Sequence, residues 1–537
     1  MEHPLPPLPR FTVSGLRRPA DQLPPAFTSL SSLLSSLHSH LVSLPCASPP
    51  TLPITIGVMV TASHNPPLDN GIKLLTSTGA LFSPAAVALL NDALEATISI
   101  PSLIPCLLPL LNAPVPALSS APSSLPHPGL LLVFATDTRL SSPSLLSLLL
   151  PPHVPHVILG YASTPELSTC LSLLPSTPQQ QLRASYLAPY VSAFAALSSL
   201  LSSPFATPSA PPAPLLPVDC AMGVAAFPLR ALLASLPPDT LSLFNVPPLN
   251  DAGTRALLNT SCGSDFILTS SSPPATHTGP SPASSALCAS VDGDGDRLIF
   301  YRAAPFLALT GDHIAALLAT FLRPLLPAHF TLAVVATAYA NSSFLQFLRE
   351  LGIAPVITAT GVAHLHHAAQ EADLGIYYEP NGHGTVLFSD SLRAALVQNE
   401  GHQLQVLRCV LELSHQTVGD AIPGLLLVPL VLRHLNVSVD EWAGWWVDRK
   451  VYQSKVGVLD KSRFHVSPDE TKVVEPAEMQ ADIDAVRGAC RCFVRASGTE
   501  DVVRVYVEEG VDGGGGEAVR EKLEAVVKKW CGARSKM

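Results

Sequence analysis

The stretch Thr61–Pro66, which reads Thr-Ala-Ser-His-Asn-Pro, follows an apolar run from Ile54 to Val60. Such a run is typical of a buried strand, so the sequence places a serine and a histidine on a loop at the strand's carboxyl end. Open α/β sheets bind their ligands at this edge. Ser63 is therefore a candidate nucleophile, although a serine in a polar loop is more often a simple turn residue.

A second informative loop carries three aspartates, Asp292, Asp294 and Asp296, at alternate positions. These carboxylates repel one another unless a cation lies among them, and hard oxygen ligands suit Mg²⁺ or Ca²⁺. A calcium EF-hand is excluded, because Arg297 and Ala303 stand where that loop needs glycine and a bidentate glutamate. The loop predicts a divalent site, most simply for magnesium, with a solvated Asp-Gly turn as the alternative.

Two more loops carry polar groups of the kind that bind sugars and phosphates. The segment Glu379–His383 follows an apolar run and offers a carboxylate, an amide and an imidazole to the hydroxyls of a polyol. The segment Arg495–Glu500, followed by Arg504 in a strand-like run, combines two arginines, two hydroxyls and a glycine. That combination can cradle an anion, although each loop taken alone could be an ordinary turn.

The four loops, in this order, resemble the α-D-phosphohexomutases, and within them the eukaryotic phosphoacetylglucosamine mutases. The resemblance runs from about residue 11 to about residue 508, so it covers nearly the whole chain. Supporting matches lie at Gly57–Val60, Asp69–Lys73, Asp137–Ser142, Thr360–His367 and Gln416–Ala421.

Apolar runs such as Leu130–Phe134 and Leu332–Val335 alternate with helical stretches, and this pattern predicts α/β units with parallel-type sheets. Segments rich in proline, serine and alanine, such as Ser202–Pro217, are interpreted as loops. At the end of the chain, apolar residues from Val519 to Trp530 share one helical face next to a strand, which predicts an α+β domain.

The resemblance implies an α/β protein with four domains around a central cleft: three α/β domains with mixed sheets and a C-terminal α+β domain. The expected domains are residues 1–187 with the serine loop (Thr61–Pro66), 188–303 with the metal or aspartate loop (Asp292–Arg297), 304–436 with the sugar loop (Glu379–His383) and 437–537 with the phosphate loop (Arg495–Glu500).

The resemblance also implies an activity, the interconversion of N-acetylglucosamine 6-phosphate and 1-phosphate through a phosphoserine and a 1,6-bisphosphate, supplying UDP-N-acetylglucosamine synthesis. The residues it assigns to catalysis are Ser63, His64, Lys73 and Arg297, and those that hold one Mg²⁺ per chain are Ser63, Asp292, Asp294 and Asp296. The residues it assigns to substrate binding are Glu379, Pro380, Asn381, His383, Arg495, Ala496, Ser497, Gly498, Thr499 and Arg504.

The negative charge that would collect around Ser63 also indicates a bound metal ion. A phosphorylated Ser63 beside three aspartates would sum to about −5 charges, which a cleft cannot hold without Mg²⁺. The metal would also polarise the phosphoryl group for transfer. Lys73 could stabilise charge or act as an acid or base, and Arg297 could screen the phosphoserine.

Several residues depart from the family pattern. Ala496 replaces a proline, Pro380 an alanine, Ala363 a lysine and Met222 an asparagine, while the altered N-terminal motif keeps Arg17. None of these changes removes the nucleophile, the metal ligands or the phosphate-binding arginine, so we expect activity to be reduced at most.

Two other functions and a second metal are compatible with part of this sequence. A mutase of glucose or mannose phosphates would share every loop, but Asn381 favours the acetamido sugar. A non-catalytic sugar-phosphate sensor would not need Ser63 and the aspartates. Zinc at His364, His366 and His367 would need further ligands, so hydrogen bonding or packing is favoured there.

Composition agrees with the large soluble enzyme that the resemblance implies. The chain has 537 residues and a net charge of −10 without a basic block, which argues against a nucleic-acid surface. Ten scattered cysteines and an N-terminus without a signal peptide favour the reducing cytoplasm. Prolines interrupt Leu-rich runs such as Leu103–Leu118, so no membrane span is expected. The expected partners are small sugar phosphates, for a monomer or weak homo-oligomer.

Overall fold

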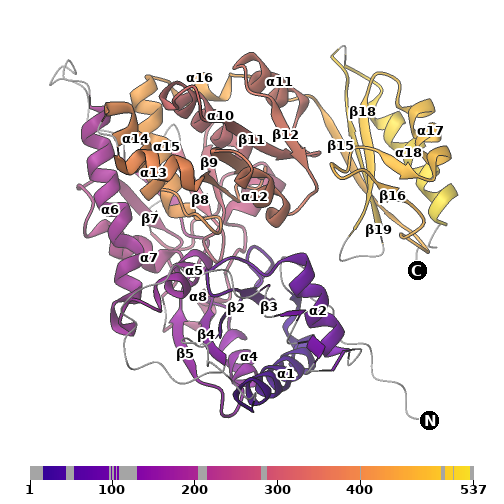
Figure 1. Cartoon of the computed structure of the whole chain (residues 1–537). Coiled ribbons are helices and arrows are strands. Elements are labelled where there is room, and N and C mark those ends of the chain that lie inside the picture. Colours follow the sequence, from indigo (N-terminus) through magenta and orange to yellow (C-terminus); the bar gives the residue numbers. More distant parts are fainter. Residues whose placement is uncertain are drawn as a thin grey trace, which may run out of the picture. The chain divides into compact units, whose positions relative to one another are not determined.

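The computed structural model describes residues 16–43, 54–95, 98–99, 102–103, 106–107, 110, 130–202, 215–248, 250–279, 287–398, 401–497, 502–511 and 513–532. The chain forms two compact units (Figure 1). The first unit comprises Met1–Gly311, Asn381–Val386 and Ala395–Asn436, and the second comprises Asp312–Pro380, Leu387–Ala394 and Val437–Met537.

The first sheet of the first unit has five strands in the order β1-β3-β2-β4-β5. Strands β2, β4 and β5 run parallel, whereas β3 and β1 are antiparallel to their neighbours. The sheet is therefore mixed, not purely parallel. The strand bounds are Leu16–Pro19 for β1, Ile54–Val60 for β2, Asp69–Leu75 for β3, Leu130–Thr136 for β4 and His156–Tyr161 for β5.

Helices bury both faces of this sheet. Helices α1, α2 and α4 share a core with Leu130, Leu132 and Phe134 of β4, whereas the intervening Leu131 and Val133 pack with α5 on the opposite face. A strand covered on both faces needs apolar residues at every position, which explains the uninterrupted runs of β2 and β4. The helix bounds are Pro24–Ser43 for α1, Pro84–Leu94 for α2, Ser142–Leu149 for α4 and Thr164–Leu173 for α5.

The second sheet of the first unit has the order β10-β9-β8-β6-β7 and is also mixed. Its strand β6 includes Leu216 and Pro217, so the predicted loop Ser202–Pro217 is wrong at its end. The strands are Leu216–Asp219 (β6), Leu241–Phe244 (β7), Leu287–Val291 (β8), Leu298–Arg302 (β9) and Leu307–Leu309 (β10), and the helices are Ala226–Leu233 (α7), Ala252–Arg255 (α8) and Ser264–Ser270 (α9).

Three longer helices complete the first unit, namely α6 (Leu182–Leu201), α14 (His402–Glu412) and α15 (Ala421–Leu435). The segment Gln179–Leu201 is the one helical segment of the described chain that is long and apolar enough to cross a membrane by length and composition. It nevertheless contacts protein: Tyr186 and Tyr190 each donate a hydrogen bond of 2.8 Å to Asp420, the N-cap of α15.

Asp420 predicts a pH-dependent stability. Burial raises its pKa to about 7, although the bonds donated by Ile422 N–H and the hydroxyls of Tyr186 and Tyr190 act in the opposite direction. The folded protein therefore keeps a proton that the unfolded chain releases above about pH 4, so stability falls as the pH rises from about 4 to about 7. Asp420→Asn is expected to flatten this fall, measured as thermal midpoints at a series of pH values. Parallel profiles for parent and variant would contradict the assignment.

The second unit holds a sheet of order β12-β11-β13-β14, to which β14 contributes from the boundary between the units. Its strands are Leu332–Thr337 (β11), Pro355–Thr358 (β12), Leu374–Tyr378 (β13) and Gly384–Phe388 (β14). Its helices are Gly311–Leu322 (α10), Ser342–Glu350 (α11), Val362–Gln370 (α12) and Val439–Ala443 (α16), with Asp390–Gln398 (α13) crossing the boundary.

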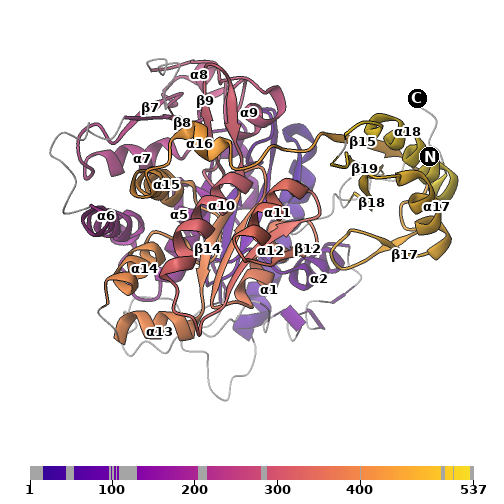
Figure 2. The same cartoon turned by 90° about the horizontal axis from the view of Figure 1, so that it is seen from above.

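The C-terminal part of the second unit is an antiparallel sheet of order β15-β19-β18, covered on one face by α17 and α18 (Figures 1 and 2). The predicted apolar face of the last helix is confirmed, because Val519, Leu523, Val526 and Val527 are buried there. The elements are Val451–Gly457 (β15), His465–Val466 (β16), Val473–Glu475 (β17), Ala477–Arg487 (α17), Arg491–Ala496 (β18), Val502–Glu508 (β19) and Gly516–Cys531 (α18).

The predicted fold class is confirmed: α/β layers with mixed sheets are followed by a C-terminal α+β region. The domain bounds at residues 187, 303 and 436 stay predictions.

Candidate active site

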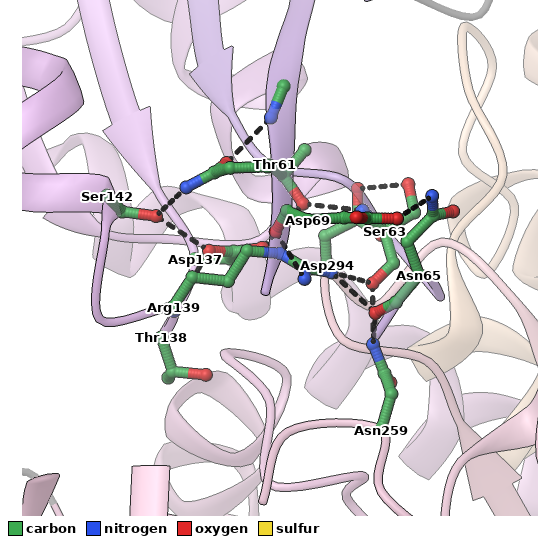
Figure 3. Close-up of polar contacts among 12 residues, drawn as sticks. Thr61, Ser63, Asn65, Asp69, Asp137, Thr138, Arg139, Ser142, Asn259 and Asp294 are labelled. Carbon is green, nitrogen blue, oxygen red and sulfur yellow. Dashed lines mark hydrogen bonds and ion pairs between the residues drawn. The ribbon is translucent and has the colours of Figure 1, made fainter. Parts of the chain in front are cut away.

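The serine loop leaves β2 and holds Ser63 in a left-handed backbone conformation, with φ of 51°. This conformation is uncommon for a residue with a side chain and is supported by a short chain of hydrogen bonds (Figure 3). The Ser63 N–H donates to Thr61 Oγ1 at 2.8 Å, and the Thr61 hydroxyl donates to Asp137 Oδ2 at 2.7 Å. Strand β4, which ends just before Asp137, thus fixes the conformation of a loop on β2.

Arg139 binds the backbone carbonyls of the same loop. Its guanidinium is fully buried and ion-paired to Asp137 at 2.9 Å. Its Nη2 donates to the carbonyls of Ser63 (2.9 Å) and Asn65 (3.0 Å), and its Nη1 donates to those of Asp69 (2.8 Å) and Pro66. All five guanidinium N–H groups therefore have acceptors, as burial of such a charge requires.

The aspartate loop joins β8 to β9, and its three carboxylates are buried with oxygens within 4.8 Å of one another. Asp292 Oδ1 accepts backbone N–H bonds from Gly295, Asp296 and Arg297 at 3.1, 3.1 and 3.2 Å. Asp292 Oδ2, Asp294 Oδ1 and Asp296 Oδ1 have no hydrogen-bond partner among the residues that the structure describes. Three buried carboxylate oxygens left this way are the donor set of a hard divalent cation, so the residues fit magnesium.

Ser63 faces this triad directly. Its Oγ lies 3.2 Å from Asp294 Oδ2, which also accepts a hydrogen bond of 2.6 Å from the Thr164 hydroxyl. Lys73 Nζ lies 2.6 Å from both Asp294 and Asp296. Burial alone would lower the pKa of Lys73, but the two carboxylates outweigh it and the net shift is upward.

Two arginines complete the charge balance. Arg17 Nη2 donates to Ser63 Oγ at 3.4 Å, and Arg297 Nε lies 3.9 Å from Asp292 Oδ2. Burial, together with the nearby charge of Arg297, lowers the pKa of Arg17. With Lys73, the three cations match the three carboxylates. A phosphate on Ser63 would add nearly two negative charges, which one divalent cation would balance.

Glycine allows the serine and aspartate loops to touch. A Cβ added at Gly293 would lie 2.7 Å from the carbonyl oxygen of Ser63, and one added at Gly223 would lie 2.5 Å from the carbonyl of Gly293. No side chain fits at such distances. The glycine between Asp292 and Asp294 is thus required by the approach of the two loops.

His64 lies half-buried next to Ser63 in the chain, and burial of its imidazole, then the charges of Arg297 and Arg17, lower its pKa. Together with Asn259 and Asp265, it lines a cavity of about 310 Å³ next to the serine loop. The low pKa keeps the imidazole neutral near its cationic neighbours.

The sugar loop is divided between the two units. Glu379 and Pro380 follow β13 in the second unit, whereas Asn381 and His383 belong to the first. The His383 N–H donates to Asn381 Oδ1 at 3.0 Å, and His383 Nδ1 lies 3.5 Å from Asp296 Oδ1. Asn381 and His383 therefore lie beside the aspartate loop.

The phosphate loop is in the second unit. Arg495 on β18 lies directly opposite Arg504 on β19, and like charges in such a pair repel unless an anion lies between them. Glu470 meets part of this need, with Oε1 at 3.5 Å from Arg495 Nη1. Ala496 ends β18 and Ser497 is buried. Gly498 and Thr499 lie outside the described residues.

The sequence did not assign four residues that the structure places at Ser63 or at its partner Asp294. Arg17 and Arg139 stood in motifs that matched the family but received no role there. Thr164 and Asn259 had no signal in the sequence, because their partners are far away along the chain: Asn259 lies 196 residues beyond Ser63.

Mixed α/β sheets with a loop serine facing a buried aspartate triad define the class of phosphosugar mutases. Three protein-family models match the chain. They are described as phosphoacetylglucosamine mutase AMG1, domain III (residues 310–437), phosphoglucomutase/phosphomannomutase, alpha/beta/alpha domain I (35–99), and phosphoglucomutase/phosphomannomutase, C-terminal domain (455–525).

Curated relatives cover most of the chain. Phosphoacetylglucosamine mutase 1 of Schizosaccharomyces pombe is 35% identical over 517 residues, which span 90% of this chain and 93% of the relative. Phosphoacetylglucosamine mutase of Sus scrofa is 36% identical over 483 residues, 84% of each chain. The chain belongs to the phosphoacetylglucosamine mutase family of the α-D-phosphohexomutases.

Solved structures agree with this assignment. N-acetylphosphoglucosamine mutase of Aspergillus fumigatus, in complex with GlcNAc-6P and magnesium, has a TM-score of 0.80 at 29% identity and covers 97% of this chain and 96% of its own. An N-acetylglucosamine-phosphate mutase in a substrate complex has a TM-score of 0.78 at 31% identity, covering 98% and 97%.

Proposed function

We propose that this chain interconverts N-acetylglucosamine 6-phosphate and N-acetylglucosamine 1-phosphate. The observation that carries the proposal is Ser63, whose hydroxyl faces a buried aspartate triad and the cations Arg17 and Lys73. A buried hydroxyl in contact with both signs of charge is suited to carry a phosphate and to exchange it with a sugar hydroxyl. The A. fumigatus and S. pombe relatives support the same substrate class by their names.

In the forward direction, phosphorylated Ser63 transfers its phosphoryl group to the free C1 hydroxyl of the 6-phosphate. The P–Oγ bond and the O–H bond of the C1 hydroxyl break, a bond from phosphorus to the sugar oxygen forms, the released proton ends on Ser63 Oγ, and a 1,6-bisphosphate results. Arg17 and Lys73 stabilise the negative charge that collects on the serine oxygen. After the bisphosphate turns around, Ser63 takes the phosphate from C6 and the 1-phosphate leaves.

Asp292, Asp294, Asp296 and an oxygen carried by Ser63 would hold Mg²⁺. When bound, the ion polarises the phosphoryl group and balances its charge. The protein's own part is to keep the three carboxylates buried and close together. The energetic cost shows at Asp292, whose pKa is raised by burial and by the carboxylates of Asp296 and Asp294.

The turn of the intermediate requires a second site that accepts whichever phosphate is not reacting. We assign this role to Arg495 and Arg504, together with Ser497, Gly498 and Thr499, which follow Arg495 closely in the sequence. Glu379 and Asn381 would hold the sugar hydroxyls and the acetamido group in both orientations, with Pro380 and His383 shaping that loop.

Arg495→Ala tests the phosphate site. The change removes a charge-assisted contact, so we expect kcat/KM to fall by about ten- to a hundred-fold, mostly through KM. The matched control is Arg487→Ala, which removes an exposed arginine whose ion pair in the described structure is with Asp484, one turn earlier on α17. Equal kinetics for Arg495→Ala and the parent would mean that the distal phosphate binds elsewhere.

Substrate choice tests the assignment of the sugar. In a coupled assay on N-acetylglucosamine, glucose and mannose 6-phosphates, we expect the acetamido sugar to have the highest kcat/KM. A site built to pair with an amide leaves polar groups unmatched when a hydroxyl replaces the amide. Asn381→Ser should therefore reduce the difference in kcat/KM between N-acetylglucosamine 6-phosphate and the other two sugars. Equal kcat/KM for all three sugars would leave a general hexose-phosphate mutase, and binding without turnover would indicate a sensor.

The cellular setting is part of the proposal. The structure forms no disulfide among the cysteines that it describes, which supports a reducing compartment such as the cytoplasm. A monomer or weak homo-oligomer remains the expected state.

A further inference from the structure

We infer that Asn259 is a positioning residue for Ser63, which it holds through the backbone of the serine loop; the inference rests on the proposed function. Asn259 lies between α8 and α9, in the part of the first unit that is built around the second sheet. The serine loop follows β2 of the first sheet. Figure 3 shows its side chain directed at that loop.

The contact is made with the backbone of the serine loop. Asn259 Nδ2 donates to the carbonyl oxygen of Ser63 at 2.7 Å and to that of Asn65 at 3.2 Å. Arg139 Nη2 donates to the same two carbonyls. Each carbonyl thus receives two donors, one from each half of the unit, which uses both of its lone pairs.

The described structure shows two side-chain donors at the Ser63 carbonyl, Arg139 and Asn259. The guanidinium of Arg139 already uses all five N–H groups, and Gly293 closes the remaining side of the Ser63 carbonyl, because even a Cβ there would lie 2.7 Å from that oxygen. Loss of the amide donor would leave the Ser63 carbonyl with one donor in a buried setting.

The backbone conformation of Asn259 is fixed by its own hydrogen bond. Its φ of 54° lies in the left-handed region, and its N–H donates to the Ala221 carbonyl at 3.0 Å. Arg255, earlier on the same segment, donates to the carbonyls of Thr138 and Arg139. This segment therefore donates hydrogen bonds both to the serine loop and to the loop that carries Arg139.

Such a contact acts on the reaction through geometry. The Ser63 backbone is left-handed, so the direction of its Oγ towards Asp294 depends on where the loop carbonyls are fixed. The serine must return to one position although its charge changes by nearly two units in each half-reaction. A misplacement of about 1 Å can cost about a hundred-fold in rate.

Two variants separate the donor from the backbone. Asn259→Asp keeps the shape and tolerates the left-handed conformation but replaces the donor with a negative acceptor, whereas Asn259→Gly keeps only the backbone freedom. We expect kcat to fall about a hundred-fold for the aspartate variant and about ten-fold for the glycine variant, with KM for N-acetylglucosamine 6-phosphate within about two-fold of the parent. Asn436→Asp, at another left-handed asparagine on an exposed helix end, is the matched control.

The phosphate carried by Ser63 provides an independent readout. After incubation with glucose 1,6-bisphosphate, intact-mass analysis counts the phosphorylated chains, and kcat is expressed per phosphorylatable chain. The positioning role is supported if the corrected kcat is highest for the parent, lower for Asn259→Gly and lowest for Asn259→Asp. Equal corrected kcat values, with only the thermal midpoint lowered, would overturn it. An inactive parent protein would instead refute the proposed function.

Discussion

Replacement of Ser63 by alanine is expected to abolish mutase turnover, with a loss of about four orders of magnitude or more. The hydroxyl is the only atom lost, and its two side-chain contacts, at 3.2 Å to Asp294 and 3.4 Å to Arg17, are long. The variant should therefore fold normally. Activity is measured in the coupled assay, and intact mass should show a phosphate on the parent that the variant lacks.

The control for this experiment is Ser144→Ala, which removes an exposed hydroxyl that donates to the Ser141 carbonyl at the start of its own helix. It should leave both activity and phosphate content unchanged. If Ser63→Ala kept substantial turnover, the phosphate would have to be carried by another group, and the mechanism proposed here would be wrong.

The second large effect is expected at Asp294. Asp294→Asn keeps the shape of the side chain but removes the charge that faces Ser63, Lys73 and Thr164. A site that loses one of three anionic ligands binds a hard cation much more weakly, so we expect kcat to fall about a thousand-fold, which corresponds to about 4 kcal/mol. Lys73 keeps its partner Asp296 at 2.6 Å, and the fold should persist.

Metal removal tests the same site without a mutation. Excess EDTA should stop turnover of the parent protein, and titration with magnesium should restore it, whereas the Asp294→Asn variant should need far more magnesium. Asp484→Asn, which changes an exposed carboxylate of α17, is the control. Full activity of the parent in excess EDTA would remove the metal role of the aspartate loop.

Several features could be read directly from the chain. Strands β2 and β4 were predicted because both of their faces are buried, which demands apolar side chains at every position. Helix α18 was predicted because burial of one face imposes a helical period on its apolar residues. The loops with Ser63 and Asp294 were found because their chemistry is carried by residue types and spacing within a few positions.

Other features depend on where distant segments meet. The apolar pattern alone predicts parallel-type sheets, and the mixed sheets came from the family resemblance; the antiparallel strands β3 and β1 leave no local signal, because apolar patterns carry no information about the direction of a neighbouring strand. The start of β6 at Leu216 was predicted as loop, since the proline and serine preceding it dominate the local composition.

The sequence by itself determined the family, the α/β class, the loop that carries Ser63 and the loop that carries the aspartate triad, because these follow from short-range patterns and their order. Only the tertiary structure decided that Arg17 contacts the serine hydroxyl, that Lys73 pairs with two aspartates and that Asn259 holds the loop backbone. The physical reason is that a hydrogen bond needs two atoms within about 3 Å, and folding brings such atoms together from segments whose separation along the chain leaves no local trace.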